Sequence, residues 1–176
     1  FLRNTSSTST VLYALTSHSV VIKSCEFKGN SILNSSLMLL FDSSASIDDC
    51  LFDSNIGTAS IDLLLSSLAL SHSVFKNQVA SGGAFISINT GSSVTVNSCQ
   101  FKSGQSKTQG GAILVNSGMI SILDSLFEEN SSRGTGGSIE ALNSILKVRR
   151  TIFKNSTAET GGGVFAAASE VEISEC

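Results

Sequence analysis

The chain of 176 residues has no proline, no tryptophan, a single tyrosine and only 14% charged residues. This charged share is well below the ~25% of ordinary globular proteins. Together with a net charge of -3, it argues against a nucleic-acid binder. No apolar run approaches the ~18 residues of a membrane-spanning helix, and runs such as residues 37–41 have the length of a strand. The sequence therefore predicts no membrane span.

Serine, asparagine, threonine and glycine fill the space between short apolar segments. This composition is typical of many strands joined by tight turns and not of long helices. The apolar residues also recur too regularly for a disordered chain. No signal peptide is visible, and the last residue, Cys176, lies inside a repeat. We therefore expect the chain to be part of a longer protein.

Phenylalanine recurs along the whole chain at spacings of 23–26 residues. The recurring positions are Phe1, Phe27, Phe52, Phe75, Phe101, Phe127 and Phe153. Four of them open a Phe-x-x-Asn tetrad, which ends at Asn4, Asn30, Asn55 and Asn130. An alternating apolar stretch precedes each later Phe. In the last four repeats a glycine pair leads into a second apolar run, and these glycines are Gly82, Gly83, Gly110, Gly111, Gly136, Gly137, Gly161 and Gly162.

A unit of this length with two or three strand-like pieces and no helical period is one rung of a solenoid. Stacked rungs share a continuous core that one rung alone cannot form. Leucine-rich repeats have a similar length, but their leucine pattern and helical segment are absent, and a propeller blade needs about 40 residues or more. The sequence predicts an all-β fold, a single right-handed parallel β-helix segment over residues 1–176 with about seven rungs of 23–26 residues.

Stacking places equivalent residues about 4.8 Å apart on neighbouring rungs. We expect the Phe column to form an internal stack of rings and the Asn column to form an amide ladder. The glycine pairs should permit positive φ and close approach of successive turns. The column after Phe contains, in order, Lys28, Asp53, Lys76, Lys102, Glu128 and Lys154. Opposite charges therefore face each other at four of its five steps.

The alternation of Gly-Gly-Ala-Ile and Phe-x-x-Asn signatures resembles the repeats of the chlamydial polymorphic outer-membrane proteins. The signatures stand here at residues 82–85, 110–113, 136–139 and 161–164, beside the four tetrads. The resemblance covers nearly the whole chain and strengthens from residue 75 onward. It implies a right-handed β-helix of the pectin-lyase-like type that is displayed outside a cell and is often adhesive. The chain departs from the bacterial pattern in its cysteines and sequons.

Cys25, Cys50 and Cys99 all lie two residues before the repeat Phe, and Cys176 falls at the same place in the next unit. The column is predicted to be one of small buried residues. Only Cys25 and Cys50 lie on adjacent rungs, within the Cα distance that a disulfide spans, so an inter-rung disulfide is a second hypothesis. Sequons occur at Asn34, Asn155, Asn4 and Asn130. Asn34, in a connecting loop, is the best predicted glycan acceptor.

An enzyme of the pectin-lyase type needs acidic residues held about 5–9 Å apart. Asp48 and Asp49 are sequence neighbours, so in a strand they are expected to point to opposite faces. For His18 and His72 we find no carboxylate in matching register. The sequence therefore predicts no catalytic residue, no cofactor site and no metal site.

The sequence favours a structural or adhesive module, extracellular or on the cell surface, which could form part of a filament or coat. The alternatives are a carbohydrate-binding β-helix and a pectin-lyase-like carbohydrate-active one. The expected partners are further rungs of the same chain or copies of itself stacked end to end, with surface glycans or proteins as other candidates. Fold alone decides between none of these.

Overall fold

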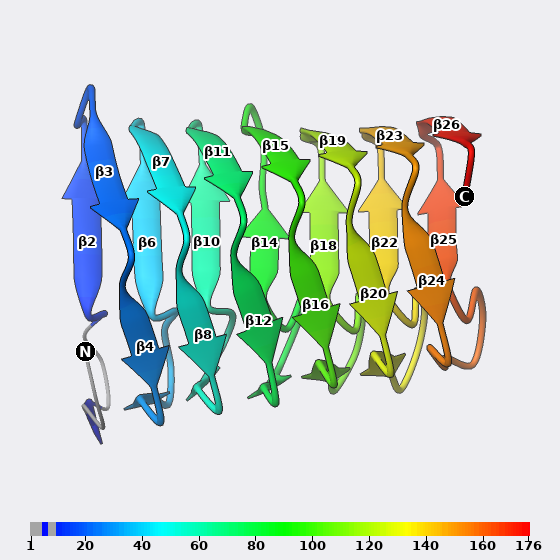
Figure 1. Ribbon diagram of the computed structural model, residues 1–176, viewed down its shortest axis with the longest axis horizontal. Coiled ribbons are helices and arrows are strands. Elements are labelled where there is room, and N and C mark those ends of the chain that lie inside the picture. Colours follow the sequence, from blue (N-terminus) through cyan, green and yellow to red (C-terminus); the bar gives the residue numbers. More distant parts are fainter. Residues whose placement is uncertain (1–4, 7–9) are drawn as a thin grey trace.

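The computed structural model describes residues 5–6 and 10–176, with side chains from residue 10 onward. The described chain consists of short strands and turns without a helix, and all strand pairs are parallel. It winds as a solenoid in which each turn adds one strand to each of four sheets (Figure 1). In Figure 1 the chain runs down the front, returns up the back and advances to the right, so the winding is right-handed.

We name the four sheets in the order in which a turn crosses them. Sheet I contains β2 (Leu12–Leu15), β6 (Met38–Phe41), β10 (Ile61–Leu64), β14 (Ile86–Ile88), β18 (Ile113–Asn116), β22 (Ile139–Leu142) and β25 (Val164–Ala167). Sheet II contains β3 (Val20–Lys23), β7 (Ser44–Asp48), β11 (Ser67–Ser71), β15 (Ser93–Asn97), β19 (Met119–Leu123), β23 (Ile145–Arg149) and β26 (Glu170–Ser174).

Sheet III contains β4 (Glu26–Lys28), β8 (Leu51–Asp53), β12 (Val74–Lys76), β16 (Gln100–Lys102), β20 (Leu126–Glu128) and β24 (Ile152–Lys154). Sheet IV contains β1 (Thr5–Ser6), β5 (Ser31–Ile32), β9 (Ile56–Gly57), β13 (Val79–Ala80), β17 (Gln105–Ser106) and β21 (Ser131–Ser132). Two sheets have seven strands and two have six, so the described residues make about six turns. Phe1, which opens the first of the seven predicted rungs, lies outside the described residues.

The predicted Phe stack is confirmed and forms the axis of the core. Neighbouring rings from Phe27 to Phe153 have centroids 4.4–5.2 Å apart and are nearly parallel. The rings from Phe27 to Phe127 are buried, and Phe153 is half-buried in the last turn. Inward-facing Ile, Leu and Val residues of sheets I and II fill the space around this stack. One continuous core therefore runs along the solenoid.

Three corners in each turn contain a residue with positive φ, and these are mostly not glycine. The corner between sheets I and II has this conformation at Thr16, Asp42, Leu65, Gly91, Ser117, Asn143 and Ala168. The corner between sheets II and III has it at Ser24, Asp49, His72, Ser98, Asp124, Arg150 and Glu175. The corner between sheets III and IV has it at Gly29, Ser54, Asn77, Ser103, Glu129 and Asn155. These corners were not predicted, because positive φ was expected at the glycine pairs.

At several corners the side chain of the residue that follows bonds to the turn before it. Ser73 Oγ accepts the Cys50 N–H at 3.0 Å and donates to the carbonyl of Ser71 at 2.7 Å. Ser66 Oγ does the same with the N–H of Ser43 and the carbonyl of Leu64. These small side chains satisfy backbone groups that the tight turn leaves without a partner.

The amide ladder is confirmed at one step only. Asn30 Nδ2 donates to Asn55 Oδ1 at 2.9 Å, and Asn55 Nδ2 donates to the Phe27 carbonyl at 2.9 Å. The ladder stops because the next positions in the column are Gln78 and Gly104. Asn130 again bonds backbone, since its amide accepts the Gly104 N–H and donates to the Phe101 carbonyl. The column therefore joins turns mainly through side chain to backbone hydrogen bonds.

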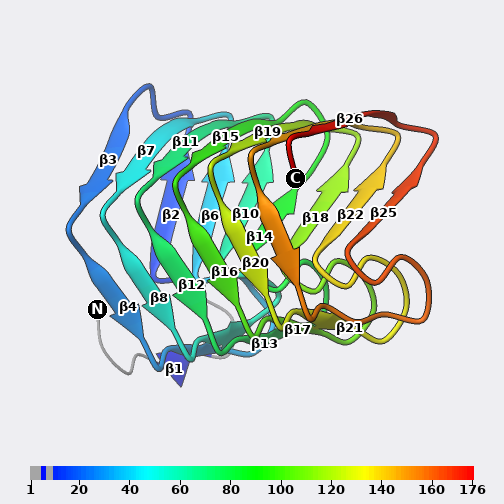
Figure 2. The ribbon, with the colours of Figure 1, turned by 45° about the vertical axis from the view of Figure 1, so that its right-hand side comes forward.

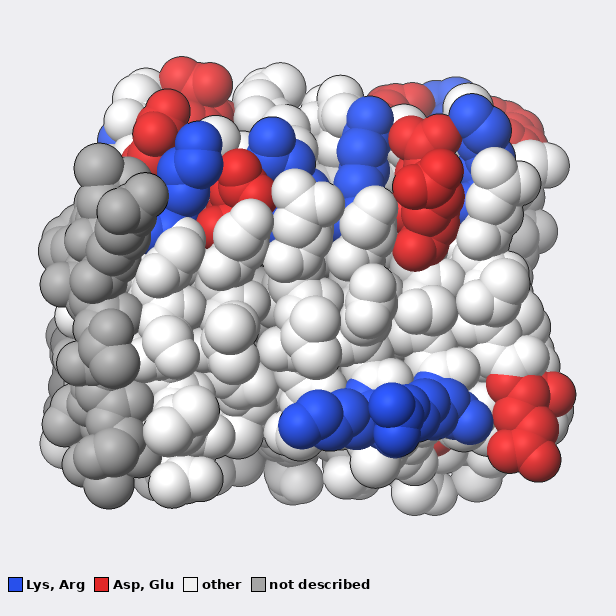
Figure 3. Space-filling view, turned by 90° about the horizontal axis from the view of Figure 1, so that it is seen from below, with Lys and Arg blue, Asp and Glu red and all other residues white. Residues whose placement is uncertain are grey.

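The predicted row of alternating charges is also confirmed. Asp53 lies between Lys28 and Lys76, with N–O distances of 3.7 and 3.5 Å, and Glu128 lies between Lys102 and Lys154 at 3.5 and 2.8 Å. Figure 3 shows this row along one border of a wide surface without charge. The like pair is Lys76 beside Lys102, as the spacing predicted.

The glycine pairs are needed more for the close approach of successive turns than for positive φ. Gly110, Gly136 and Gly161 have positive φ, whereas Gly82 does not. The second glycines carry the packing: a Cβ on Gly137 would collide with the carbonyl oxygen of Gly162 and lie 2.8 Å from that of Thr157. The loops that contain these glycines project from the later turns (Figure 2).

Replacing Gly137 by Ala should destabilise the fold by about 1–3 kcal/mol, because the next turn must move away from the added methyl group. Urea unfolding followed by circular dichroism measures the change. Gly163→Ala is the matched control, since a Cβ there has no heavy atom within 4 Å. Equal stability of the two variants would show that the close approach is unimportant.

Candidate functional site

The predicted glycan acceptors differ in their exposure. Asn34 and Asn155 are exposed, whereas Asn130 is fully buried and its amide nitrogen donates to a backbone carbonyl. Asn4 lies outside the described residues. A sugar on Asn130 would remove that hydrogen bond and could not fit the folded turn. The geometry therefore favours Asn34 and Asn155 as acceptors.

The four cysteines are free thiols, and they occupy one column of the corner between sheets II and III. Cys25 Sγ donates to the Lys23 carbonyl at 3.1 Å, and Cys50 Sγ donates to the Asp48 carbonyl at 3.2 Å. Burial raises the pKa of the Cys99 thiol to about 11. The predicted column of small buried residues is confirmed at Cys50 and Cys99, whereas Cys25 is half-buried and Cys176 is exposed. The disulfide between Cys25 and Cys50 stays a hypothesis.

The expectation for His72 is wrong, because two carboxylates lie beside it. Register pairs Ser71 with Asp48, so Asp49 stacks under His72, and Asp48 Oδ1 lies 2.9 Å from His72 Nδ1. Asp48 belongs to the column of Ser71, so its hydrogen bond to His72 joins two neighbouring columns. A comparison of residues within one column does not detect such a contact. Asp49 has positive φ and bonds Ser24 Oγ at 2.9 Å, so the prediction that the two Asp side chains point to opposite faces is also wrong.

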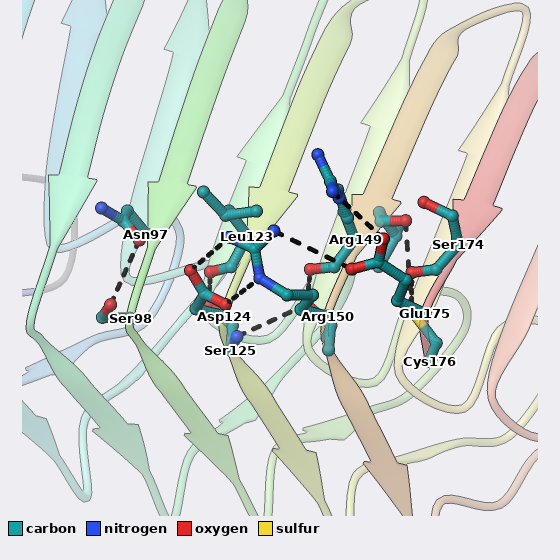
Figure 4. A network of polar contacts seen from close by, with 12 residues as sticks. Asn97, Ser98, Leu123, Asp124, Ser125, Arg149, Arg150, Ser174, Glu175 and Cys176 are labelled. Atoms are coloured by element: carbon teal, nitrogen blue, oxygen red, sulfur yellow. Dashed lines mark hydrogen bonds and ion pairs between the residues drawn. The ribbon is translucent and has the colours of Figure 1, made fainter.

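The same corner continues as a network of ion pairs toward the last turn (Figure 4). Arg150 makes two hydrogen bonds to Asp124, at 2.7 and 3.0 Å, and a longer ion pair of 3.9 Å to Glu175. Arg149 Nη2 bonds Glu175 at 3.1 Å. These charged groups are all solvent-exposed, so each pair adds little to stability. Their effect is to favour one alignment of successive turns.

Asp48 and Asp124 of this corner and Glu128 of the charge row have lowered pKa values. The hydrogen bond from His72 and then that from Ser71 lower the pKa of Asp48, and the Arg150 hydrogen bond lowers that of Asp124. The hydrogen bond from Lys154 lowers the pKa of Glu128. A general acid needs a raised pKa, so these groups suit ion pairing and not proton donation.

The outer face of sheet I contains an apolar strip that sequence reasoning missed. Tyr13 and Leu15 of β2 are 57% and 51% exposed, and they pair in register with Leu39 and Phe41 of β6, which are half-buried. We call these four residues the apolar strip. The alternation of Leu12 to Leu15 could have signalled it, because period-2 alternation places Tyr13 and Leu15 on the side opposite the core.

Asp62 lies beside this strip and is the described carboxylate with the clearest rise in pKa. Its register partner in β6 is Leu39, and its Oδ1 accepts a 2.7 Å hydrogen bond from Asn89. Burial raises the pKa of Asp62 to about 6 against the opposing effect of the hydrogen bonds from Asn89 and Ser36. Proton exchange near neutral pH is therefore possible here.

Glu140 is the second raised carboxylate on the outer face of sheet I. It is buried beneath the glycine loops, where Gln109 Nε2 and Thr135 Oγ1 donate to it at 2.9 and 2.6 Å. Burial raises its pKa. Three strand steps separate it from Asp62, or about 14 Å at the spacing of parallel strands. This is too far for the acid pair of a glycosidase, whose carboxyls are about 5–9 Å apart.

Within residues 5–6 and 10–176 no three His, Cys, Asp or Glu side chains are placed to hold a metal ion. No helix in the same residues has the length and hydropathy to cross a membrane. Comparison of the chain with protein-family models, curated proteins and solved structures finds no match in any of the three. The site must therefore be interpreted from its own geometry.

Asp62→Asn should change how stability depends on pH. The pKa of Asp62 is raised in the folded state, so its protonated form favours folding and that advantage is lost as pH rises from about 4 to about 6. The free energy of unfolding of the wild type relative to Asp62→Asn should fall by about 2 kcal/mol over this range and then stay constant. Urea unfolding at several pH values measures it, with the exposed Asp42→Asn as control. A difference that does not vary with pH would contradict the burial of Asp62.

Proposed function

We propose that the chain is a structural or adhesive β-helix module that acts outside a cell or on its surface. The observation that carries this proposal is the unbroken register of four parallel sheets through about six turns around one stack of rings. Such a stack resists bending, because any bend must open hydrogen bonds and ring contacts in several columns at once. A rod of roughly 29 Å results, at about 4.8 Å per turn.

The sequence signatures that prompted the resemblance to polymorphic outer-membrane repeats have structural roles in this chain. The Phe of each tetrad builds the ring stack, the Asn bonds backbone of the preceding turn, and the second glycine of each pair permits close approach. These roles support, as a proposal, a passenger segment of the pectin-lyase-like type on a surface, in a coat or in a filament.

The last turn supports the proposed partners. Val171 and Ile173 of β26 are 41% and 48% exposed, although their register partners Leu146 and Val148 of β23 are buried. Each thus occupies a core-facing position that no other described turn covers. A further rung of the same chain, or a copy stacked end to end, would cover this apolar edge. Unpaired strands at a sheet edge favour such pairing with another strand.

The proposal is tested on native material from the source organism. An antibody raised against the folded chain should label intact, unpermeabilised cells or their secreted matrix. If the route is a eukaryotic secretory one, glycopeptide mass spectrometry should find sugar at Asn34 and Asn155 and none at the buried Asn130. Labelling that requires permeabilised cells, with all sequons unmodified, would contradict an extracellular module.

The apolar strip favours carbohydrate binding as a second candidate function. The aromatic rings of Tyr13 and Phe41 belong to adjacent strands of one flat face and stand in diagonal positions, about 7–8 Å apart in such sheets. Aromatic faces of this kind can stack on sugar rings.

A glycan array probed with the purified chain tests this candidate. Binding that falls at least about ten-fold in Tyr13→Ala, but not in Val21→Ala at another exposed apolar position, would favour it, since a sugar-stacking ring carries most of such a contact. No retained glycan, or equal binding by both variants, would leave the structural role as the remaining proposal.

A further inference from the structure

Cys25 and Cys50 stack directly on adjacent turns. Backbone pairing fixes their spacing on both sides, since the Ser24 N–H donates to the backbone carbonyl of Asp48 at 3.0 Å and the Leu51 N–H donates to that of Cys25 at 2.9 Å. Neighbouring parallel positions are about 4.8 Å apart, which lies within the Cα separation of about 4.4–6.8 Å found across disulfides.

The thiol of Cys50 points toward the turn that contains Cys25. Its Sγ lies 3.8 Å from the Ile22 carbonyl oxygen, which belongs to that preceding turn. The other cysteines of this column have no cysteine on a neighbouring turn, because Ser73 and Ser125 flank Cys99, and Thr151 precedes Cys176. Cys25 with Cys50 is therefore the one adjacent pair of cysteines in the described column.

Solvent reaches the pair through an open groove of about 500 Å³ along this corner. The groove is lined by Ser24, Cys25, Glu26, Asp49, Cys50 and His72, among others. Cys25 is half-exposed and Cys50 is buried, so Cys25 is the member that a dissolved reagent meets first. Cys99, by contrast, is buried at every side.

We propose that Cys25 and Cys50 form a reversible disulfide by exchange with a small-molecule disulfide such as oxidised glutathione. The Cys25 thiolate attacks one glutathione sulfur, the glutathione S–S bond breaks, and one glutathione thiolate leaves. The Cys50 thiolate then attacks the Cys25 sulfur and expels the second glutathione. Two electrons pass to the oxidant, and the two released glutathione thiolates take up the two cysteine protons.

The bond fastens the first complete turn to the second. Among the described residues, β3 and β4 are the end strands of sheets II and III, and they pair with β7 and β8 of the next turn. Local opening separates such strand pairs transiently. A cross-link that closes one whole turn opposes this opening, so the redox state of the pair controls how firmly the first turn is held. This inference does not rest on the proposed function.

The pairing is tested in the full chain with Cys176→Ser, which removes the exposed thiol. The protein is incubated with oxidised glutathione, alkylated and cleaved after Lys and Arg. Cys25, Cys50 and Cys99 then fall on separate peptides, residues 24–28, 29–76 and 77–102. We expect peptide 24–28 joined to peptide 29–76 with the loss of two hydrogens. We also expect amide hydrogen exchange in β3 to slow by about ten-fold on oxidation, because the cross-link keeps β3 paired with β7.

Serine replacements give matched controls, since Ser already occupies this column at positions 73 and 125. Cys99→Ser should keep the link, and Cys50→Ser should stop at a glutathione adduct on Cys25. The same oxidation in urea should scramble the pairings, which shows that the reagents work. Cys25 and Cys50 both alkylated in the folded chain, or Cys25 held as a glutathione adduct with Cys50 alkylated, would overturn the proposal.

Discussion

The structure depends on one constraint, which is that every corner must lie directly over the corner of the turn before it. A corner this tight needs left-handed backbone, which costs roughly 1–2 kcal/mol at a residue other than glycine. It also leaves backbone N–H groups that cost about 1–3 kcal/mol each when buried without a partner. The residue after the corner removes the second cost: Ser66, Ser73 and Asn130 each accept an N–H from the preceding turn. The Phe stack fills the interior that these hydrogen-bonded corners enclose.

Equal spacing in the sequence becomes adjacency in a solenoid, and this is why much of the fold was predictable. The spacing of Phe27 to Phe153 predicted the ring stack, and the residue after each Phe predicted the row from Lys28 to Lys154. The corners were not predictable from residue type, because Leu65, His72 and Arg150 adopt positive φ only where the turns above and below hold them. The contact of His72 with Asp48 was missed because it joins neighbouring columns. The apolar strip was missed because the prediction followed the recurring Phe column and did not consider which face Phe41 occupies; Phe41 belongs to the outer face of sheet I.

The charges on the surface determine alignment more than they determine stability. Asp53 and Glu128 each bond two lysines, one from either neighbouring turn, and Asp124 and Glu175 share Arg150 in the same way. The exposed pairs of Arg150 contribute little to stability, whereas Asp53 is buried and its charge depends on its two lysines. Displacing one turn by a residue would exchange inward and outward side chains and take Asp53 out of register with both of its lysines. The pairs therefore add to the specificity that the buried columns already impose.

A perfect solenoid repeat places like residues beside like, whereas catalysis and recognition require unlike groups to meet. Departures from the repeat are therefore where chemistry can arise in this chain. Asp62 stands next to the apolar Leu39 of the previous turn, and the rise of its pKa to about 6 follows from that break in the column. Tyr13 and Phe41 form an exposed aromatic surface only on the first two turns, before the glycine loops cover the equivalent face around Glu140. Cys25 and Cys50 are adjacent only there as well. The later turns follow the repeat more closely, so the unlike groups of this chain gather on the early turns, where a disulfide between Cys25 and Cys50 would also join one turn to the next.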